Sequence, residues 1–273
     1  MKWRVTLGGA VPAVIAFFSL FGFVRVVGII VCEHKVSAGY SLAEDYLRAV
    51  RDTAHPDSSL VSRSLVSIDP SKPIMVVSWM RQDKVQYFKG TTTASGRDTW
   101  VTIVPNLKLF CQDYVRSHGA DPEHLALRLK QRLGMPPDSG NDTFVELTLG
   151  PKDMLKIFRP CGDPSINSNT CNLAIDDSNP PPTPDKTEES LKTVDTKNPR
   201  DVEKYWFLSK YYWSFASPNP YPWTSLGYTF DWARREDGSG DFVRWGESEF
   251  VIPGGTPIHF VSSKSNAEYC APQ

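Results

Sequence analysis

A run of apolar residues near the amino terminus limits the possible folds of this chain more than any other pattern in it. Residues 5–24 contain no charged side chain, whereas Lys2 and Arg4 precede them and Arg25 follows. A helix of about 20 residues rises roughly 30 Å, which is the thickness of the hydrocarbon core of a bilayer. We therefore predict a transmembrane signal anchor at residues 1–32 and an exported domain behind it.

A cleaved signal peptide is the main alternative to a retained anchor, and a buried core helix is a third. A cleavable signal has a shorter apolar region and a small-x-small site before the cut. No Ala-x-Ala pattern precedes Glu33, and Val31, which is not a small residue, precedes Cys32. These features favour a single-pass protein of the inner membrane, with the bulk of the chain in the periplasm or another extracytoplasmic space.

The cysteines indicate an oxidising compartment. Cys32 lies at the predicted membrane boundary, and the four cysteines beyond it form an even set, which behind an export signal is typical of disulfides. Cys161 and Cys171 enclose a loop rich in turn formers, so we predict that they pair. The remaining pair, Cys111 with Cys270, then ties the carboxyl terminus to the middle of the chain.

Several classes of function are disfavoured by charge and motif. The chain carries 30 basic and 31 acidic residues, a net charge of −1, whereas a nucleic-acid binder needs a basic excess. The histidines are scattered and no close cysteine pair occurs, so no zinc site is predicted. No phosphate-binding or dinucleotide-binding glycine motif is present. We therefore expect no metal, no cofactor and no nucleic-acid partner.

Hydrophobic periodicity predicts a mixture of helices and strands before residue 150. Short apolar runs predict strands at residues 73–80, 85–88, 100–104 and 144–149. The first two of these strands are predicted to form a hairpin. Expected helices carry capping residues at their ends and span residues 41–53, 105–118 and 121–134. This order indicates an α+β fold.

The second half of the chain is divided by a polar, proline-rich segment at residues 178–201, which is either a disordered insertion or a linker. It separates a first part at residues 33–177 from an aromatic-rich part at residues 202–273. If Cys111 pairs with Cys270, the two parts must pack together. We therefore predict one composite, disulfide-stapled domain with a mixed or antiparallel sheet, behind the transmembrane helix.

Aromatic residues are concentrated in this carboxyl-terminal part. A helix is expected across residues 205–215, and two strands are expected at residues 248–252 and 258–261, around a Pro-Gly-Gly-Thr-Pro turn. Aromatic side chains near proline and asparagine either fill a core or stack on sugars, peptides or lipid headgroups. The candidate binding residues are Tyr221, Trp223, Tyr228 and Trp232.

Three motifs in this region resemble those of a group of exported bacterial proteins that has no known activity. They are FRPCxDP at residues 158–164, PYPWTSLGYTFDW at 220–232 and SEFVI at 248–252, and Glu268-Tyr269-Cys270 accompanies them. The similarity spans roughly residues 100–270. It implies export and a shared fold, and it carries over no catalytic residue.

One pair of carboxylates is a candidate for catalysis. Glu247 and Glu249 stand two residues apart, so a strand would place them on one side, where acid-base chemistry becomes possible if burial separates their pKa values. Arg244 is nearby. The pattern loosely resembles the Glu-x-Glu turn of ADP-ribosyltransferases, although Thr91-Thr92-Thr93 is a poor substitute for the Ser-Thr-Ser strand of that family. The alternative is a charged, solvated strand edge.

We therefore expect a non-enzymatic protein with a binding or envelope-assembly role, anchored in the membrane and contacting an envelope protein partner. The alternative is an enzyme, a transferase or a hydrolase, that uses Glu247 and Glu249. A pocket that holds both carboxylates beside Arg244 or His259 would favour the enzyme. A flat aromatic patch with both carboxylates in solvent would favour binding.

Overall fold

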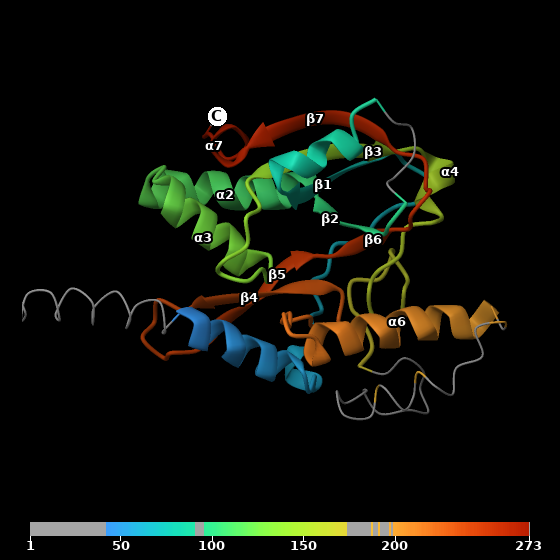
Figure 1. The fold of residues 1–273 in the computed structure, drawn as a ribbon, viewed down its shortest axis with the longest axis horizontal. Helices are drawn as coiled ribbons and strands as arrows, with labels where there is room; N and C mark the ends of the chain where they lie inside the picture. Colours follow the sequence, from blue (N-terminus) through green and yellow to red (C-terminus); the bar gives the residue numbers. More distant parts are fainter. Residues whose placement is uncertain are drawn as a thin grey trace, which may run out of the picture. The chain divides into compact units, whose positions relative to one another are not determined.

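Five antiparallel strands form the main sheet of the computed structural model of this chain (Figure 1). The structure describes residues 42–90, 96–173 and 199–272, together with Thr187, Leu191 and Lys197. The strand order is β6-β2-β1-β3-β7, with bounds Phe250–Ile252, Thr99–Ile103, Ile74–Met80, Thr143–Leu149 and His259–Ser265 in that order. The predicted α+β class is confirmed, and the sheet is antiparallel rather than mixed.

Strands β1 and β3 are the centre of the sheet. They pair over seven residues, from Ile74 opposite Leu149 to Met80 opposite Thr143. Both strands are rich in β-branched and aromatic residues, which favour extended backbone where both faces are covered. The neighbouring strands on either side, β2 and β7, then extend the same ladder outward.

Helices α2, at Val104–His118, and α3, at Pro122–Arg132, cover one face of the sheet (Figure 1). Asp121 caps α3, because its carboxylate accepts hydrogen bonds from two backbone N–H groups of the first turn. The short helix α7, at Asn266–Tyr269, completes this layer. The shared core comprises Val77, Trp79, Leu107, Cys111, Leu125, Leu129, Phe144, Tyr269 and Cys270.

The opposite face is covered by shorter elements. These are the 3-10 helix η2, at Gln82–Tyr87, and the one-turn helix α4, at Pro151–Met154, which contribute Val85 and Met154 to the core on this side. A further 3-10 helix, η1 at Ser58–Leu60, contacts Tyr228 instead. The predicted strand at residues 85–88 is wrong, since this segment lies in and just beyond η2. Val85 and Phe88 are buried while the two residues between them are exposed, and this spacing of three is helical rather than extended.

A second, two-stranded sheet pairs β4, at Tyr228–Arg234, with β5, at Phe242–Ser248, and neither strand was predicted. Helix α6, at Pro199–Ala216, contacts the end of a helix at residues 42–53, since its Tyr211 hydroxyl donates to the Ala54 oxygen (Figure 1). The Arg48 guanidinium of the latter helix lies over the Phe242 ring of β5. For this last helix, contacts are described from Tyr46 onward. Tyr46 donates a hydrogen bond to the backbone oxygen of Pro220 and its ring meets Trp232 edge-on.

The two last strands, which were expected around the turn at residues 253–257, do not pair with each other. Strand β6 pairs with β2 at one edge of the main sheet, and β7 pairs with β3 at the other edge. The turn at residues 253–257 therefore leads the chain across the sheet instead of reversing it. All three residues of β6 are buried, so β6 is covered by neighbouring elements rather than by β7.

Both predicted cysteine pairs lie at disulfide distance. Cys111 and Cys270 have Cα atoms 5.1 Å apart, and those of Cys161 and Cys171 are 6.4 Å apart. Residues from Tyr46 onward form one compact unit. Strands from both sides of the proline-rich segment lie in the same five-stranded sheet, because β1 to β3 precede the segment and β6 and β7 follow it.

The predicted membrane anchor at residues 1–32 lies outside the described residues. Within the described part of the chain, none of the helices combines the length and the apolar character needed to span a bilayer. Most of the predicted insertion at residues 178–201 is also outside the described residues.

Candidate functional site

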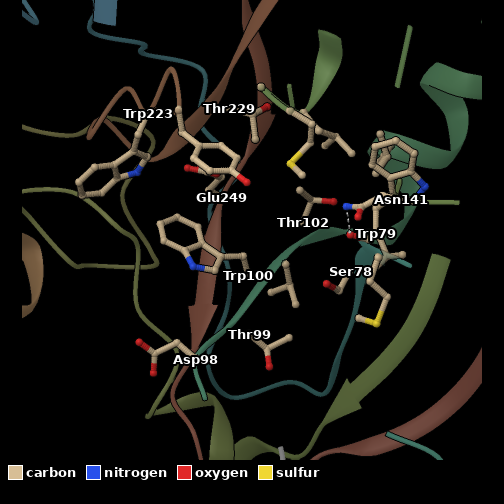
Figure 2. Close-up of a pocket in the computed structure, with 18 of the residues that line it drawn as sticks. Ser78, Trp79, Asp98, Thr99, Trp100, Thr102, Asn141, Trp223, Thr229 and Glu249 are labelled. Atoms are coloured by element: carbon tan, nitrogen blue, oxygen red, sulfur yellow. Dashed lines mark hydrogen bonds between the residues drawn. The ribbon is translucent and has the colours of Figure 1, made fainter. Parts of the chain in front are cut away.

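A cavity of about 970 Å³ lies against β1 and β2 and is bordered by the segment that follows α6 (Figure 2). Its volume is in the range of pockets that hold small molecules. Residues of β4, the start of α2 and the loop after α3 complete the wall. The cavity thus draws on both sheets and on segments from residue 77 to residue 249.

Strand alternation explains why several large side chains face this cavity. Val77 of β1 stands opposite Thr102 of β2, and Trp79 and Trp100 are each two residues away along their strands. Because side chains two residues apart share a face, Trp79, Trp100 and Thr102 project to the same side of the sheet. Figure 2 shows all three among the lining residues.

An aromatic wall forms where the segment after α6 meets β2. The Trp223 ring stands edge-on to Trp100, with the ring centroids 6.1 Å apart, and it packs against Phe207 of α6 at 5.2 Å. Trp206 stacks on Trp100 with the ring centroids 6.1 Å apart and donates a hydrogen bond of 2.7 Å to the Asp98 carboxylate. These contacts fix the orientation of the indoles that line the cavity.

Glu249 lies between β5 and β6 and lines the cavity. Its backbone N–H donates to the Gly227 oxygen at 2.9 Å, which holds the residue in place. Its side chain is partly buried, and its Oε2 atom is fully buried with no hydrogen-bond partner among the described residues. Burial raises the pKa of the Glu249 carboxyl to about 8, so near neutral pH this acid is mostly protonated.

Residues with unpartnered buried polar atoms are concentrated around this cavity. In the described part of the chain, five buried side-chain polar atoms have no protein hydrogen-bond partner, and one of them belongs to Arg48. The other four belong to residues that line the cavity, namely Thr99, Thr102, Trp223 and Glu249. Buried polar groups in folded proteins are nearly always hydrogen-bonded, so such a cluster is typical of a site that receives a ligand or ordered water.

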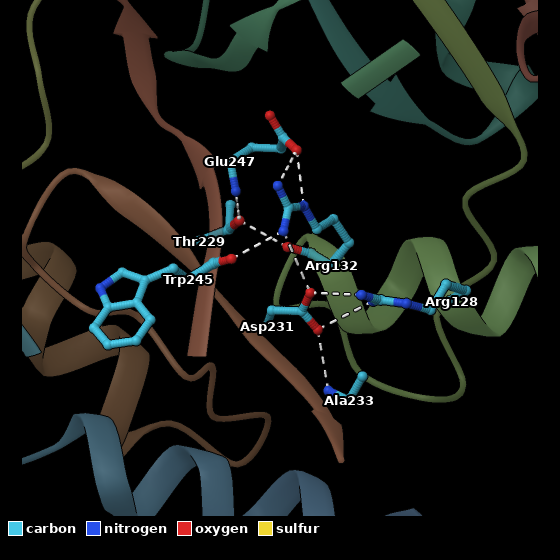
Figure 3. A network of polar contacts seen from close by, with 7 residues as sticks. All are labelled: Arg128, Arg132, Thr229, Asp231, Ala233, Trp245 and Glu247. Carbon is cyan, nitrogen blue, oxygen red and sulfur yellow. Dashed lines mark hydrogen bonds and ion pairs between the residues drawn. The ribbon is translucent and has the colours of Figure 1, made fainter. Parts of the chain in front are cut away.

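A separate network of ion pairs braces β4 and β5 against α3 (Figure 3). Arg128 donates to both carboxylate oxygens of Asp231, at 3.0 and 2.8 Å. Arg132 donates to Glu247 at 2.8 Å and to the backbone oxygen of Trp245 at 2.9 Å. Asp231 and Glu247 are both buried, so these arginines neutralise charges that would otherwise be costly to bury.

The structure does not bring the candidate catalytic residues together. Glu247 is only 3% exposed and is paired with Arg132, whereas Glu249 faces the cavity alone. Arg244 lies on β5 with a positive φ of 74° and is not among the residues that line the cavity. His259 is exposed on β7. The arrangement therefore matches neither the pocket with two carboxylates nor the flat aromatic patch.

Three of the four candidate binding aromatics line the cavity: Tyr221, Trp223 and Tyr228. Tyr228 is buried and donates its hydroxyl to the Leu60 oxygen at 2.7 Å. Trp232 lies elsewhere in the core, where its N–H donates to the Met135 oxygen at 3.1 Å. Most of this aromatic motif is thus buried, and Tyr221 is the exception at 40% exposed.

Several lining residues were missed by sequence reasoning. Trp79, Trp100 and Thr102 stand in predicted strands, and Asn141 stands just before one. Asn141 donates its side-chain N–H to the Trp79 backbone oxygen at 2.9 Å. Alternation along each strand placed Trp100 and Thr102 on one face. Strand alternation alone does not reveal on which face of the main sheet the cavity lies, because the position of the cavity depends on how the second sheet packs.

The three motifs quoted above meet around Arg159, which is fully buried. Its guanidinium donates to the backbone oxygens of Val66 and Ser168, at 2.8 and 3.0 Å, and lies over the Phe250 ring. Gly227 adopts a φ of 77° against the Arg159 side chain, and a Cβ there would collide with it. Burial lowers the pKa of Arg159 to about 10. These motifs thus hold the frame around the cavity.

No cluster of three or more histidine, cysteine or acidic side chains is placed to hold a metal ion within the described ranges. Comparison of the chain with protein-family models, with curated proteins and with solved structures gave no match. The resemblance of its motifs to a group of exported bacterial proteins therefore stays a prediction.

Proposed function

We propose that this chain is an exported binding protein whose cavity holds a small ligand through aromatic and polar contacts. The observation that carries the proposal is that one cavity is lined by four of the five described residues with an unpartnered buried polar atom, namely Thr99, Thr102, Trp223 and Glu249. An apolar, aromatic wall with a few polar groups is the usual composition of a site that orients a small molecule. The ligand would supply hydrogen bonds to those of these atoms that face the cavity.

A cavity ligand is better supported than a protein partner on an aromatic surface. Trp223, Tyr228 and Trp232 are each less than a tenth exposed, so little of the predicted aromatic surface is open to a partner. An envelope protein that contacts another face of the domain remains compatible with a ligand-binding cavity. The disulfide-distance pairs and the apolar segment at residues 5–24 support export and anchoring.

An enzyme remains the second candidate, because one observation favours it. A carboxyl with a pKa of about 8 inside a cavity has the protonation state of a general acid near neutral pH. The ion pair of Glu247 with Arg132 removes the second carboxylate from such chemistry. The binding role therefore has the stronger support.

Ligand access to the cavity is tested with the neutral apolar dye N-phenyl-1-naphthylamine. We expect saturable binding with energy transfer from tryptophan. The variant Trp100→Leu removes a lining indole and should weaken binding at least tenfold. Trp213→Leu is the matched control, since Trp213 is 63% exposed on α6 and does not line the cavity. Unsaturable binding, or equal loss in both variants, would contradict the proposal.

Export and anchoring are tested on the full chain in cells. After membrane fractionation, the chain should stay with membranes under a carbonate wash. Alkylation before and after reduction should show Cys111, Cys161, Cys171 and Cys270 as blocked thiols. If the protein is recovered in the soluble fraction with its cysteines reduced, export is refuted, but the evidence for the cavity is unaffected.

A further inference from the structure

Glu249 differs from three buried carboxylates of this domain whose ion pairs are described. Asp231 is paired with Arg128, Glu247 with Arg132 and Glu146 with Lys264. No ion pair joins Glu249 to any residue in the described ranges, and its Oε2 atom has no hydrogen-bond donor there. The fold thus supplies a cation to three buried carboxylates and leaves the one in the cavity without a countercharge.

From this contrast we propose that the cavity selects a small organic cation, an alkylammonium ion, which pairs with the Glu249 carboxylate among the surrounding indoles. The inference rests on the proposed function, because it names the chemical class of the ligand for the same cavity. It uses Glu249 as a binding residue, and no covalent step is involved.

The walls around Glu249 favour positive charge. Figure 2 shows Glu249 beside Trp223 and close to the Trp100 indole, with Thr102 and Asn141 across the cavity. Aromatic faces carry negative charge density and attract cations, and indole does so most strongly. An anion would meet both these faces and the carboxyl unfavourably. A carboxyl flanked by indoles is therefore suited to an ammonium group.

A neutral hydrogen-bonding ligand explains the site less well. The protonated acid can donate one hydrogen bond to such a ligand, but the net gain of a neutral hydrogen bond is small. An ammonium ion converts the acid into a buried ion pair, where attraction between charges in a medium of low dielectric is far stronger. The same ion also compensates the burial that keeps the acid protonated in the empty cavity.

Other ionisable groups along the cavity are exposed or are engaged by their own contacts. Lys84 of η2 pairs with Asp83 and is exposed, as are Tyr87 of η2 and Arg97 at the rim. Asp98 accepts from Trp206 and pairs with Lys210. Tyr221 and Tyr228 also line the cavity, and burial raises the pKa of both phenols, so they stay neutral between pH 6 and 9. These groups leave Glu249 as the acid that a bound cation would ionise.

The test compares two probes of the same shape. Choline carries a quaternary ammonium, and 3,3-dimethylbutan-1-ol replaces it with a neutral tert-butyl group. In calorimetric titrations of the full chain at pH 8.5, choline should bind at least tenfold more tightly than the alcohol. Because protonated Glu249 must lose its proton, choline affinity should fall about tenfold per pH unit below 8, whereas that of the alcohol stays constant.

Two variants assign the effect to Glu249. Glu249→Gln should abolish both the preference for choline and its pH dependence, while the neutral dye N-phenyl-1-naphthylamine still binds and so reports an intact cavity. Asp98→Asn is the matched control, because Asp98 also lines the cavity but is already paired, and it should keep the preference.

The outcomes separate this inference from the proposed function. If the dye binds and both probes bind equally, or the alcohol binds more tightly, the cavity is a ligand site and the cation inference is overturned. If choline is preferred but Glu249→Gln retains the preference, the inference also fails. If neither the dye nor the probes bind, the proposed function fails with it.

Discussion

Arg132 holds Glu247 through two guanidinium nitrogens, Nε and Nη2, each 2.8 Å from the same carboxylate oxygen. The two residues are 115 positions apart in the chain, so this contact fixes α3 against β5. The Thr229 hydroxyl adds to the same junction, because it donates to the Arg132 backbone oxygen and accepts from the Glu247 N–H. This junction forms one side of the frame around the cavity.

Breaking this ion pair should strongly destabilise the domain. Glu247→Gln removes the nearer countercharge of a mostly buried arginine and leaves it only Asp231, at 3.6 Å, so we expect a loss of about 3 kcal/mol in the free energy of unfolding. Urea denaturation at pH 7 measures it. The control is Asp113→Asn, which breaks the exposed pair with Arg116 and should cost less than about 1 kcal/mol. Equal effects of the two substitutions would contradict the assigned role of Glu247.

Gly246→Ala should destabilise the domain without any change of charge. A Cβ at this position would collide with the Arg132 and Thr229 backbone oxygens, which cannot move without opening the junction. Overpacking of this kind costs about 1–3 kcal/mol. The comparison is Gly255→Ala, whose Cβ would meet open space, although its φ of 78° adds backbone strain. Thermal unfolding should show the larger loss for Gly246→Ala, and the reverse order would refute the steric argument.

Glu249 should make stability fall as the pH rises. Its pKa is near 4.5 when unfolded and about 8 in the folded protein because of burial, so between these values the folded state binds more protons. Folding therefore weakens with rising pH, by at most about 1.4 kcal/mol per pH unit, until the effect levels off above pH 8. Glu249→Gln removes this pH-dependent loss of stability. The free energy of unfolding of the variant, relative to that of the wild type, should therefore increase from pH 5 to pH 8.

Glu146→Gln is the control for this pH series. Burial raises the pKa of Glu146, but the Ser262 hydroxyl and Lys264 outweigh burial and lower it overall. The stability from a lowered pKa is present above the unfolded pKa of about 4.5 and is lost only below it. The difference between Glu146→Gln and wild type should thus stay flat from pH 5 to pH 8. A flat difference for Glu249→Gln would show that Glu249 is not buried as described.

The two cysteine pairs should contribute unequally. Cys111 and Cys270 close a loop with a sequence separation of 159, whereas Cys161 and Cys171 are separated by 10. Chain-entropy arguments give roughly 5 kcal/mol for the long loop and roughly 3 kcal/mol for the short one. Denaturation of the two double serine variants measures these values. A larger cost for the short loop would argue that the long bridge does not form.

Much of the main sheet and its helices could be predicted from the sequence, because each signal was local. The β-branched runs of β1 and β3 need no distant partner to indicate strands. Asp121 before Pro122 marks the start of α3 by capping alone. The cysteine pairing followed from one turn-rich loop and the two cysteines left over.

The cavity could not be predicted, because it depends on long-range packing. Asp231 is buried on β4 only because α3 supplies Arg128, and this pairing cannot be deduced from local patterns. Two-residue spacing predicted Glu247 and Glu249 on one side of a strand. Strand β5 instead ends at Ser248, so the chain changes direction between the two carboxylates and sends them into different surroundings.

The cavity as a ligand site is tested most directly by the indole N–H signals in a ¹⁵N-correlated NMR spectrum of the full chain. The eight tryptophans are assigned by single substitutions. On titration with N-phenyl-1-naphthylamine and then choline, the signals of Trp223 and Trp100 should shift together and saturate. The signals of Trp213 and Trp245, which are exposed outside the cavity, should stay in place. Shifts confined to these exposed indoles, or no saturable shift of Trp223, would contradict the account.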